Sequence, residues 1–324
     1  MTEHDLLAAG SITARNADPA RFVAAVIITY NCYTSIERTI LAVANQVGRV
    51  MIVDNGSEPE TLTAIRSAID RNRLQNCEFL PQGRNLGIGA ALNVGVRAAL
   101  AVGAQYVLTL DDDTEVFPGT VAELVRCFID HETQRVGIVW GYWIDEINFP
   151  QISCRGENAP RSVERIPSSG CMIRREAFES VGMFREDYFL DYTDYEYCAR
   201  IIGAGWQVLI CPAATVFHRS GDKVFRKFFG RTVVVSNYPA ERLFLFCRNG
   251  IVLYLWERRS GRYLREHCRS MAAIFVKSIL YEREKSRKAS TIIHASVEGL
   301  LGRLGPPSPR DGDYRIRRLE EDRS

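Results

Sequence analysis

QYVLTLDDDTEV, at residues 105–116, is the most informative stretch of this chain. Its first half is apolar and rich in β-forming residues, which predicts a buried strand that ends abruptly at Asp111, Asp112 and Asp113. Neighbouring carboxylates repel each other, and burying them without a cation is costly. Mg²⁺ or Mn²⁺ relieves that repulsion and commonly bridges protein carboxylates to phosphate oxygens. A solvated acidic turn before the next helix is the alternative, and the stretch alone leaves both interpretations open.

The chain before this stretch alternates between strand and helix patterns. We predict strands at residues 24–30, 49–54 and 77–81, besides 105–110, and helices at 36–46 and 88–102 with a capping box at Ser57 between them. Strands separated by such helices pair in parallel, which predicts an α/β sheet with helices on both faces. Ligands of such sheets lie at the carboxyl ends of the strands. Four polar clusters fall there: Tyr30-Asn31, Asp54-Asn55, Arg84-Asn85 and Asp111–Asp113.

The pattern loosens after residue 117 and becomes mostly helical from residue 238. Strands are predicted at 135–144 and 206–211, a loop at 145–168 and a helix at 193–202. Three aromatic residues, Trp140, Tyr142 and Trp143, are expected in the core. We divide the chain into a flexible N-terminus (1–22), a main domain (23–230, with halves 23–115 and 116–230), a C-terminal helical region (231–304) and a mobile tail (305–324).

The composition excludes several classes of protein. A hydrophobic content of 46%, a charged content of 25% and a net charge of +2 are ordinary for a soluble globular protein and give no sign of nucleic-acid binding. Nine scattered cysteines without a CxxC pair indicate reduced thiols rather than disulfides or zinc. Residues 1–20 lack the apolar core of a signal peptide, and no uninterrupted apolar run reaches the roughly 18 residues of a spanning helix. We therefore expect a cytoplasmic protein.

A set of motifs, in order along the chain, resembles glycosyltransferase family 2. The first half contributes IITYN (27–31), VDNGS (53–57), GRNLGIGAALNVG (83–95) and LDDDTEV (110–116). The second half contributes SSGCMIRREAFESVGMF (168–184), FLDYTDYEYCAR (189–200) and HRSG (218–221). With YPAERLFLFCRN (238–249) and GLLGRLG (299–305), the set most resembles bacterial rhamnosyltransferases of that family, and it is also similar to galactofuranosyl- and hexosyltransferases.

This resemblance, over about residues 23–302, implies a fold and a reaction. The implied fold is GT-A, an α/β fold with a Rossmann-like, mostly parallel central sheet flanked by helices and here a helical C-terminal extension. The implied reaction is a metal-dependent, inverting transfer from a nucleotide-diphosphate sugar. The nucleotide sugar would bind at Thr29, Tyr30, Asn31, Asp54, Asn55, Arg84, Asn85, Gly87, Asp111, Asp112 and Arg248.

Some of these residues have a specific expected role and a simpler alternative. Tyr30 would stack on a pyrimidine base, or is an ordinary strand-end tyrosine. Asp54 would accept a hydrogen bond from the base or ribose, or starts an Asp-Asn-Gly turn. The glycines after Arg84 would let the donor approach the backbone, or form a simple turn. Arg248 would grip the diphosphate, or pairs with Glu241 or Glu257.

The resemblance also assigns the metal ligands and the base. Asp113, Asp111 and His218 would hold Mg²⁺ or Mn²⁺. Asp194 would be the base that takes the proton of the acceptor hydroxyl, because it stands six residues before Arg200, as in the family. The family's usual Glu-Asp pair reads Thr193-Asp194 here, so a share of Asp191 or Glu196 in this role stays open. The acids at this helix start also suit the helix dipole alone.

The most specific expectation is transfer of L-rhamnose from dTDP-L-rhamnose to a polyprenyl-diphosphate-linked or other glycan. A UDP-linked hexose or galactofuranose is the alternative donor. The basic C-terminal helices would lie on the inner face of the plasma membrane, unless they form a merely solvated face. A nucleotidyltransferase is disfavoured because TYNCYTS (29–35) lacks the glycines and basic residues of its phosphate loop. A non-catalytic scaffold has no need of a metal acid pair and a separate base.

Overall fold

The computed structural model describes residues 19–144, 159–218, 224–228 and 231–306. Four expected segments therefore lie wholly or partly outside the described residues: the flexible N-terminus at 1–22, the loop at 145–168, the 218–221 motif beyond His218, and the tail at 305–324.

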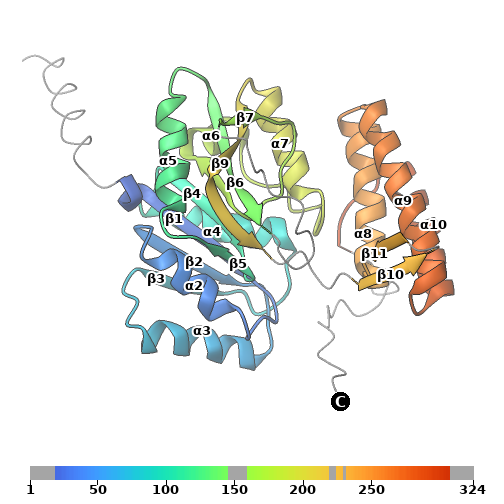
Figure 1. Ribbon diagram of the computed structural model, residues 1–324, viewed down its shortest axis with the longest axis horizontal. Coiled ribbons are helices and arrows are strands. Elements are labelled where there is room, and N and C mark those ends of the chain that lie inside the picture. Colours follow the sequence, from blue (N-terminus) through green and yellow to red (C-terminus); the bar gives the residue numbers. More distant parts are fainter. Residues whose placement is uncertain (1–18, 145–158, 219–223, 229–230, 307–324) are drawn as a thin grey trace, which may run out of the picture.

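Four parallel strands form the first half of the central sheet, in the order β3-β2-β1-β4 (Figure 1). The strands are β1 (Val23–Thr29), β2 (Arg49–Asp54), β3 (Cys77–Pro81) and β4 (Tyr106–Asp111). A short 3-10 helix, η1 (Pro19–Phe22), leads into β1, and the connecting helices are α2 (Ile36–Ala44), α3 (Pro59–Arg71) and α4 (Ile88–Ala101). The alternating pattern thus predicted this half of the fold correctly.

The capping box expected at Ser57 is wrong. Helix α3 has Glu58 at its N-cap with no side-chain cap hydrogen bond, and Pro59 begins the helix. The Ser57 hydroxyl instead accepts a hydrogen bond from the backbone N–H of Asn31, at 2.8 Å. Ser57 therefore links the ends of β1 and β2.

The second half of the sheet is mixed, where the sequence predicted mostly parallel strands. The order continues β4-β8-β6-β9-β5, and only β6 and β9 pair in parallel there. The elements are β5 (Thr114–Val116), α5 (Thr120–Asp130), β6 (Val136–Ile144), β7 (Arg161–Ser162), β8 (Cys171–Arg174), α6 (Arg175–Val181), α7 (Thr193–Gly203) and β9 (Gln207–His218). Strand β9 runs past the expected end at residue 211, and its last residues pair with β5.

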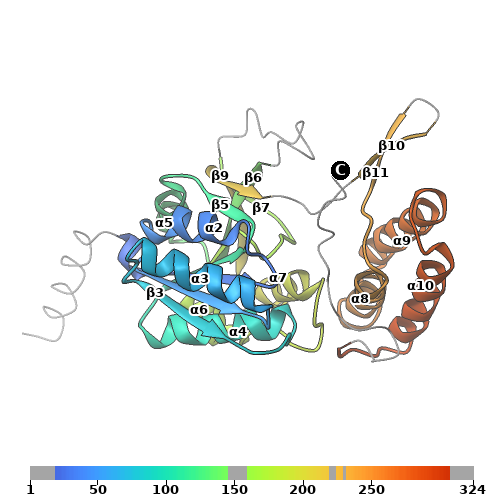
Figure 2. The same ribbon diagram turned by 90° about the horizontal axis from the view of Figure 1, so that it is seen from below.

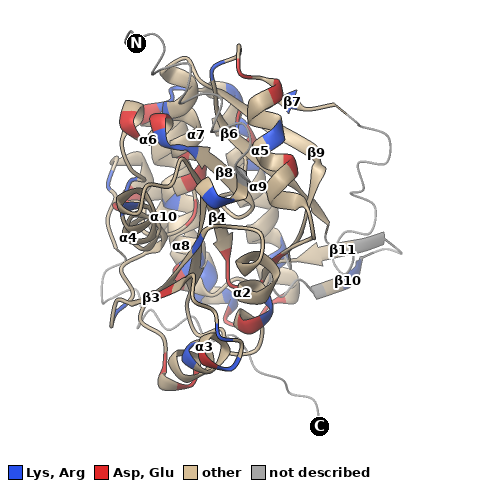
Figure 3. Cartoon of the chain, turned by 90° about the vertical axis from the view of Figure 1, so that its left-hand side faces the viewer, with Lys and Arg blue, Asp and Glu red and all other residues tan. Residues whose placement is uncertain are grey.

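Two hydrophobic cores lie on opposite faces of the sheet. Ala25 and Ile27 of β1 belong to the core with α2, α3 and α5, whereas Ala24, Val26 and Ile28 belong to the core with α4, α6 and α7. Successive strand side chains point to opposite faces, so a strand covered on both faces is apolar throughout. Each fully buried Val or Ile contributes about 1.5–3 kcal/mol. The outer helices carry charges of both signs, as along α3 (Figure 3).

The C-terminal region begins with a hairpin and continues as helices (Figure 2). The antiparallel hairpin of β10 (Val224–Phe228) and β11 (Arg231–Val235) spans the expected domain boundary at residue 230. Helix α8 (Ala240–Ile251) continues as the π-helix η2 (Val252–Glu257), and α9 (Gly261–Tyr281) and α10 (Lys285–Leu300) follow.

Close backbone packing and one buried ion pair hold these helices together. A Cβ at Gly299 of α10 would lie 3.0 Å from the backbone oxygen of Arg248, so only glycine allows this approach to α8. Lys288 and Glu282 form a buried ion pair between the ends of α9 and α10. Within the described residues, no helix has both the length and the apolar character needed to span a bilayer.

Candidate active site

Asp111, Asp113 and His218 meet at the carboxyl end of β4. Asp111 ends β4, and the antiparallel pairing of β5 with β9 places Thr114 opposite His218. His218 Nδ1 lies 3.3 Å from Asp113 Oδ1 and 2.7 Å from the Thr114 hydroxyl. Each of the two aspartates and the histidine offers one ligand atom, and these atoms lie within 4.8 Å of one another. The structure thus brings together the three residues expected to hold the metal.

The chemistry of this cluster fits a divalent cation. Two carboxylates and an imidazole offer two oxygens and one nitrogen, a mixed set that suits Mn²⁺ and is also open to Mg²⁺. Burial of His218 at 8% exposure keeps the ring fixed beside the acids. Bound there, a cation would neutralise the diphosphate and the negative charge that grows on it as it leaves.

Ser169 organises this cluster, although no role was predicted for it from the sequence. Its hydroxyl, 1% exposed, accepts a hydrogen bond from the Asp111 N–H at 2.9 Å and lies 2.7 Å from the Thr114 hydroxyl. Its backbone oxygen accepts hydrogen bonds from the indole N–H groups of Trp140, at 2.9 Å, and Trp143, at 3.1 Å. The SSG motif (168–170) was the only feature of the sequence that drew attention to Ser169. Its contacts arise because β8 lies beside β4, which no local pattern shows.

The expected core aromatics are linked to the site. The Trp143 ring stacks on the His218 imidazole, with 4.2 Å between their centroids. Trp140 and Trp143 also contact each other, with 5.4 Å between their centroids. These rings therefore form one wall behind the metal cluster.

Asp112 points away from its two neighbours. Its carboxylate accepts a hydrogen bond from the Tyr30 N–H at 3.1 Å, and its backbone oxygen accepts from the hydroxyls of Ser35 and Thr39. This arrangement separates the middle carboxylate from the other two, which lowers the repulsion within the triplet. Asp112 thereby joins the end of β4 to the end of β1, where Tyr30 was expected to meet the base.

The loops after β1 and β2 are built from side chains in the predicted donor set. Asn31 adopts φ = 55°, and its side-chain oxygen accepts from the Glu58 N–H at 2.8 Å. The Asp54 carboxylate, 1% exposed, accepts from the N–H groups of Gly56 and Ser57, so the Asp-Asn-Gly turn is confirmed. Contact of Asp54 with the base stays a prediction. The buried Thr29 hydroxyl has no hydrogen-bond partner among the described residues.

The asparagines link the second and third strand ends. Asn55 donates to the Asn85 side-chain oxygen at 3.0 Å and accepts from the Leu86 N–H at 2.9 Å. Arg84 is exposed beside them. The backbone of Arg84 lies so close to Gly56 that a Cβ on Gly56 would be 2.3 Å from its carbonyl carbon.

Gly87 lies against a protein loop. It has φ = 84°, and a Cβ there would be 2.7 Å from the Phe189 backbone oxygen. The same oxygen accepts a hydrogen bond from the Ile88 N–H at 2.7 Å. The glycine therefore allows the start of α4 to contact the segment that leads to Asp194.

Asp194 lies in the first turn of α7, half-buried. Burial, and next the negative charges of Asp191 and Asp111, raise its pKa to about 7, against the hydrogen bond from the Tyr195 N–H. The charge of Asp111 is thus close enough to contribute to the raised pKa of Asp194. A carboxylate with such a pKa is half ionised near neutral pH, which suits a general base.

The other two acids of this segment are paired with arginines. Glu196 is buried and binds Arg200 at 2.6 Å, and Asp191 accepts from Arg242 at 3.3 Å. These pairings leave Asp194 as the acid best suited to accept a proton.

Arg248 is 3% exposed within α8, and its guanidinium donates to the backbone oxygen of Gly305 at 2.7 Å. Its contact with the diphosphate stays a prediction. Of the two acids named as alternative partners, Glu241 pairs with Arg287 and Glu257 pairs with Arg185. In the sequence, Arg248 stood out as a charged residue within an otherwise apolar helix. In the structure it contacts Gly305 inside the protein.

Comparison with known proteins gives one family match and curated relatives. Residues 24–182 match the glycosyl transferase family 2 model. The chain is 28% identical over 300 residues to the dTDP-rhamnosyl transferase RfbF of Shigella flexneri, covering 87% of this chain and 96% of the relative. It is 24% identical over 312 residues to an N-acetylglucosaminyl-diphospho-decaprenol L-rhamnosyltransferase of Mycobacterium tuberculosis, covering 82% of this chain and 96% of the relative.

Solved structures share the fold. A mannosyltransferase from Pyrobaculum calidifontis, in complex with GDP-Man and Mn²⁺, superposes with a TM-score of 0.57 at 17% identity, covering 87% of this chain and 88% of the other. Staphylococcus aureus TarS 1-349 with UDP-GlcNAc gives 0.56 at 16% identity, covering 86% and 81%. The fold is thus α/β of the GT-A type. The match of residues 24–182 to the glycosyl transferase family 2 model and the similarity to two curated rhamnosyltransferases support the conclusion that this protein is a glycosyltransferase with a family 2 domain over those residues.

Proposed function

We propose that this enzyme transfers L-rhamnose from dTDP-L-rhamnose, with inversion, to a hydroxyl of a lipid-linked or cell-surface glycan. The observation that carries the reaction is the cluster of Asp111, Asp113 and His218, and the raised pKa of the Asp194 carboxyl supports its role as the base. The donor and the acceptor class rest on the names of the two curated relatives, one a dTDP-rhamnosyl transferase and the other acting on a decaprenol-linked sugar. A UDP-linked hexose or galactofuranose remains the alternative donor.

The residues divide the reaction between them. Asp111 and Asp113, with His218, would hold Mn²⁺ or Mg²⁺ against the diphosphate. The acceptor oxygen attacks the anomeric carbon while the bond from that carbon to the diphosphate oxygen breaks. The proton of the acceptor hydroxyl moves to the Asp194 carboxylate, and the nucleoside diphosphate leaves with the bonding electron pair. Attack opposite the leaving group inverts the configuration.

Donor titrations test the substrate. Purified protein is titrated with dTDP-L-rhamnose, dTDP, UDP-glucose, UDP-galactose, UDP-galactofuranose and GDP-mannose, each with and without Mn²⁺. We expect Mn²⁺-dependent preference for dTDP-L-rhamnose. Preference for a UDP or GDP sugar would overturn the donor and keep the mechanism.

Two variants test the site. Asp113→Ala should weaken Mn²⁺-dependent binding of dTDP, while Glu115→Gln, which removes one negative charge from the same stretch, should not. Asp194→Asn should abolish transfer, by about 10²–10⁴-fold for a lost general base, and leave donor binding nearly intact. Unchanged binding by the first variant would place the metal elsewhere, and normal transfer by the second would remove Asp194 as base.

Peripheral membrane contact through the C-terminal helices is part of this proposal. Residues 257–303 hold eleven Lys and Arg against five Asp and Glu, a net charge of +6, whereas the whole chain has +2. Six large apolar side chains are exposed on the same helices: Val276, Leu280, Ile293, Val297, Leu300 and Leu301. A basic surface with exposed apolar side chains suits an anionic lipid surface.

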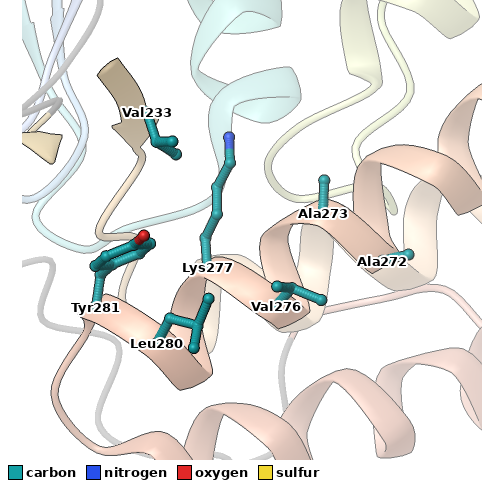
Figure 4. A pocket seen from close by; sticks show the side chains of 7 residues that line it. All are labelled: Val233, Ala272, Ala273, Val276, Lys277, Leu280 and Tyr281. Carbon is teal, nitrogen blue, oxygen red and sulfur yellow. The ribbon is translucent and has the colours of Figure 1, made fainter. Parts of the chain in front are cut away.

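An open groove adds apolar surface at one end of this face. It has a volume of about 400 Å³ and lies between Val233 of β11 and the outer side of α9, with Val276, Leu280 and Tyr281 on its wall and Lys277 beside it (Figure 4). Its lining is almost wholly apolar, so acyl or prenyl chains fit it better than a polar ligand.

Vesicle sedimentation tests this contact. We expect binding to vesicles with 30% phosphatidylglycerol and none to pure phosphatidylcholine, with loss in high salt. Val276→Asp and Arg269→Gln should weaken binding, while Arg71→Gln on α3 should not. Equal binding of all three variants, or none by the wild type, would refute the contact.

A further inference from the structure

The loop that leads to Asp194 has an unusual backbone. Phe189, Asp191 and Tyr192 have φ values of 63°, 57° and 68°, in the left-handed region, and Tyr192 is the N-cap of α7. Residues other than glycine rarely adopt this conformation, and bulky ones only where the surroundings hold them. Three such residues within four positions require an external support.

Asn249 of α8 supplies that support. Its side chain is 0% exposed, and its amide nitrogen donates to the backbone oxygens of Tyr188 at 2.8 Å, Leu190 at 2.7 Å and Asp191 at 3.2 Å. A primary amide has two N–H bonds, so two of the three carbonyl oxygens each accept one N–H, and the third shares one of these N–H groups. One buried amide thus fixes the carbonyls of a four-residue segment.

Arg248 fixes the orientation of that amide. Its Nε donates to the Asn249 side-chain oxygen at 3.0 Å, and its Nη2 donates to the Gly305 backbone oxygen at 2.7 Å. A guanidinium can only donate, so the amide oxygen faces it and the amide nitrogen faces the loop.

Gly250 makes room for a second contact with the loop. A Cβ there would lie 2.3 Å from the His267 ring of α9. The Tyr192 hydroxyl donates to His267 Nδ1 at 2.7 Å, and His267 Nε2 donates to the Cys247 backbone oxygen at 3.1 Å. Burial lowers the pKa of His267 to about 4, so the ring is neutral and keeps this pattern at neutral pH.

We propose that Arg248-Asn249-Gly250 positions the loop ahead of Asp194, with Asn249 as the positioning residue, so that the C-terminal helices set the place of the base. This proposal rests on the role of Asp194 proposed above. Among the described residues the hydrogen bonds of the Asn249 side chain go to Arg248 and to the loop ahead of Asp194, so we expect its loss to lower the rate of transfer more than the donor affinity.

Asn249→Ala and the nearly isosteric Asn249→Asp are compared with Asn93→Ala. Asn93 is a matched control, because it is 2% exposed and also makes three hydrogen bonds, to the backbone N–H and oxygen of Phe184 and to the Glu186 side chain. The measurements are kcat and KM for dTDP-L-rhamnose, and backbone hydrogen exchange of residues 187–196 without substrate.

Both Asn249 variants should lower kcat by about 100-fold, as expected for a displaced catalytic group, with KM within about threefold of the wild type. They should speed exchange in residues 187–196, while Asn93→Ala leaves this exchange and kcat near wild type. Unchanged exchange or kcat in folded Asn249 variants would overturn the proposal. So would failure of both to fold while Asn93→Ala folds, because the amide would then serve the fold alone. Hydrogen exchange tests the loop contact independently of the catalytic role of Asp194. Normal transfer by Asp194→Asn would refute Asp194 as the base, whereas the exchange measurement would still test whether Asn249 holds the loop.

Discussion

The pH dependence of transfer gives the sharpest test of Asp194. Burial and the charges of Asp191 and Asp111 raise its pKa to about 7, and only the ionised carboxylate accepts a proton. With this pKa the ionised fraction is about 0.1 at pH 6 and about 0.9 at pH 8. Bound Mn²⁺ would offset the contribution of Asp111, so the rate should rise by up to about tenfold between these two pH values. An ordinary aspartate, with a pKa near 3.9, would give a flat profile over this range.

The assay measures release of nucleoside diphosphate at saturating donor and acceptor, from pH 5 to 9. Metal binding itself weakens at low pH because the ligands must be deprotonated, so the profile is recorded at two saturating Mn²⁺ concentrations. A limb due to metal binding moves to lower pH as the Mn²⁺ concentration increases, whereas the limb due to Asp194 stays. Asp187→Asn, an exposed acid of the same segment, serves as control. A flat profile above pH 5, or a limb that moves wholly with Mn²⁺, would refute the assignment.

Three further variants probe the same site. Ser169→Ala removes the hydroxyl that accepts the Asp111 N–H, so the free energy of unfolding measured in urea should fall by about 2 kcal/mol. A decrease below about 0.5 kcal/mol would contradict this. Gly87→Ala places a Cβ at a positive φ and against the backbone of Phe189, so it should lower the free energy of unfolding by about 3 kcal/mol or more. A wild-type melting temperature would show that the loop moves to accommodate the Cβ. Asp194→Asn should raise the melting temperature. The raised pKa destabilises the ionised folded state, so the gain should grow from pH 4 to pH 7, and a gain independent of pH would exclude burial as its cause.

Features that arise within one short stretch were predictable from the sequence. The strand before Asp111 and the acids after it lie together in the chain, so β-propensity and charge pattern located them directly. The parallel strands β1 to β4 follow from alternation with helices, which leaves few topologies. His218 was placed by its motif, although its contact with Asp113 depends on pairing between β5 and β9, and β5, with three residues, was not predicted.

Features that depend on distant pairing were missed or assigned wrongly. Ser169 acquires its role only because β8 lies antiparallel beside β4, and no local pattern reports that insertion. The polar residues of α8 illustrate the same limit. Helical periodicity shows that Arg248 and Asn249 interrupt an apolar face, but it does not show which element each of them contacts. The sequence therefore did not show that Arg248 contacts Gly305 and Asn249.

The contact between α8 and the loop before Asp194 has a consequence for synthesis of the chain. The Asn249 amide lies 58 to 61 residues downstream of the carbonyls it holds. A growing polypeptide thus completes the strand bearing Asp111 and the loop itself before the residue that fixes the loop exists. At about 5–20 residues per second, this interval lasts at least roughly 3–12 seconds. With the positioning role proposed for Asn249, a nascent chain would therefore not have its base in place until α8 has been synthesised.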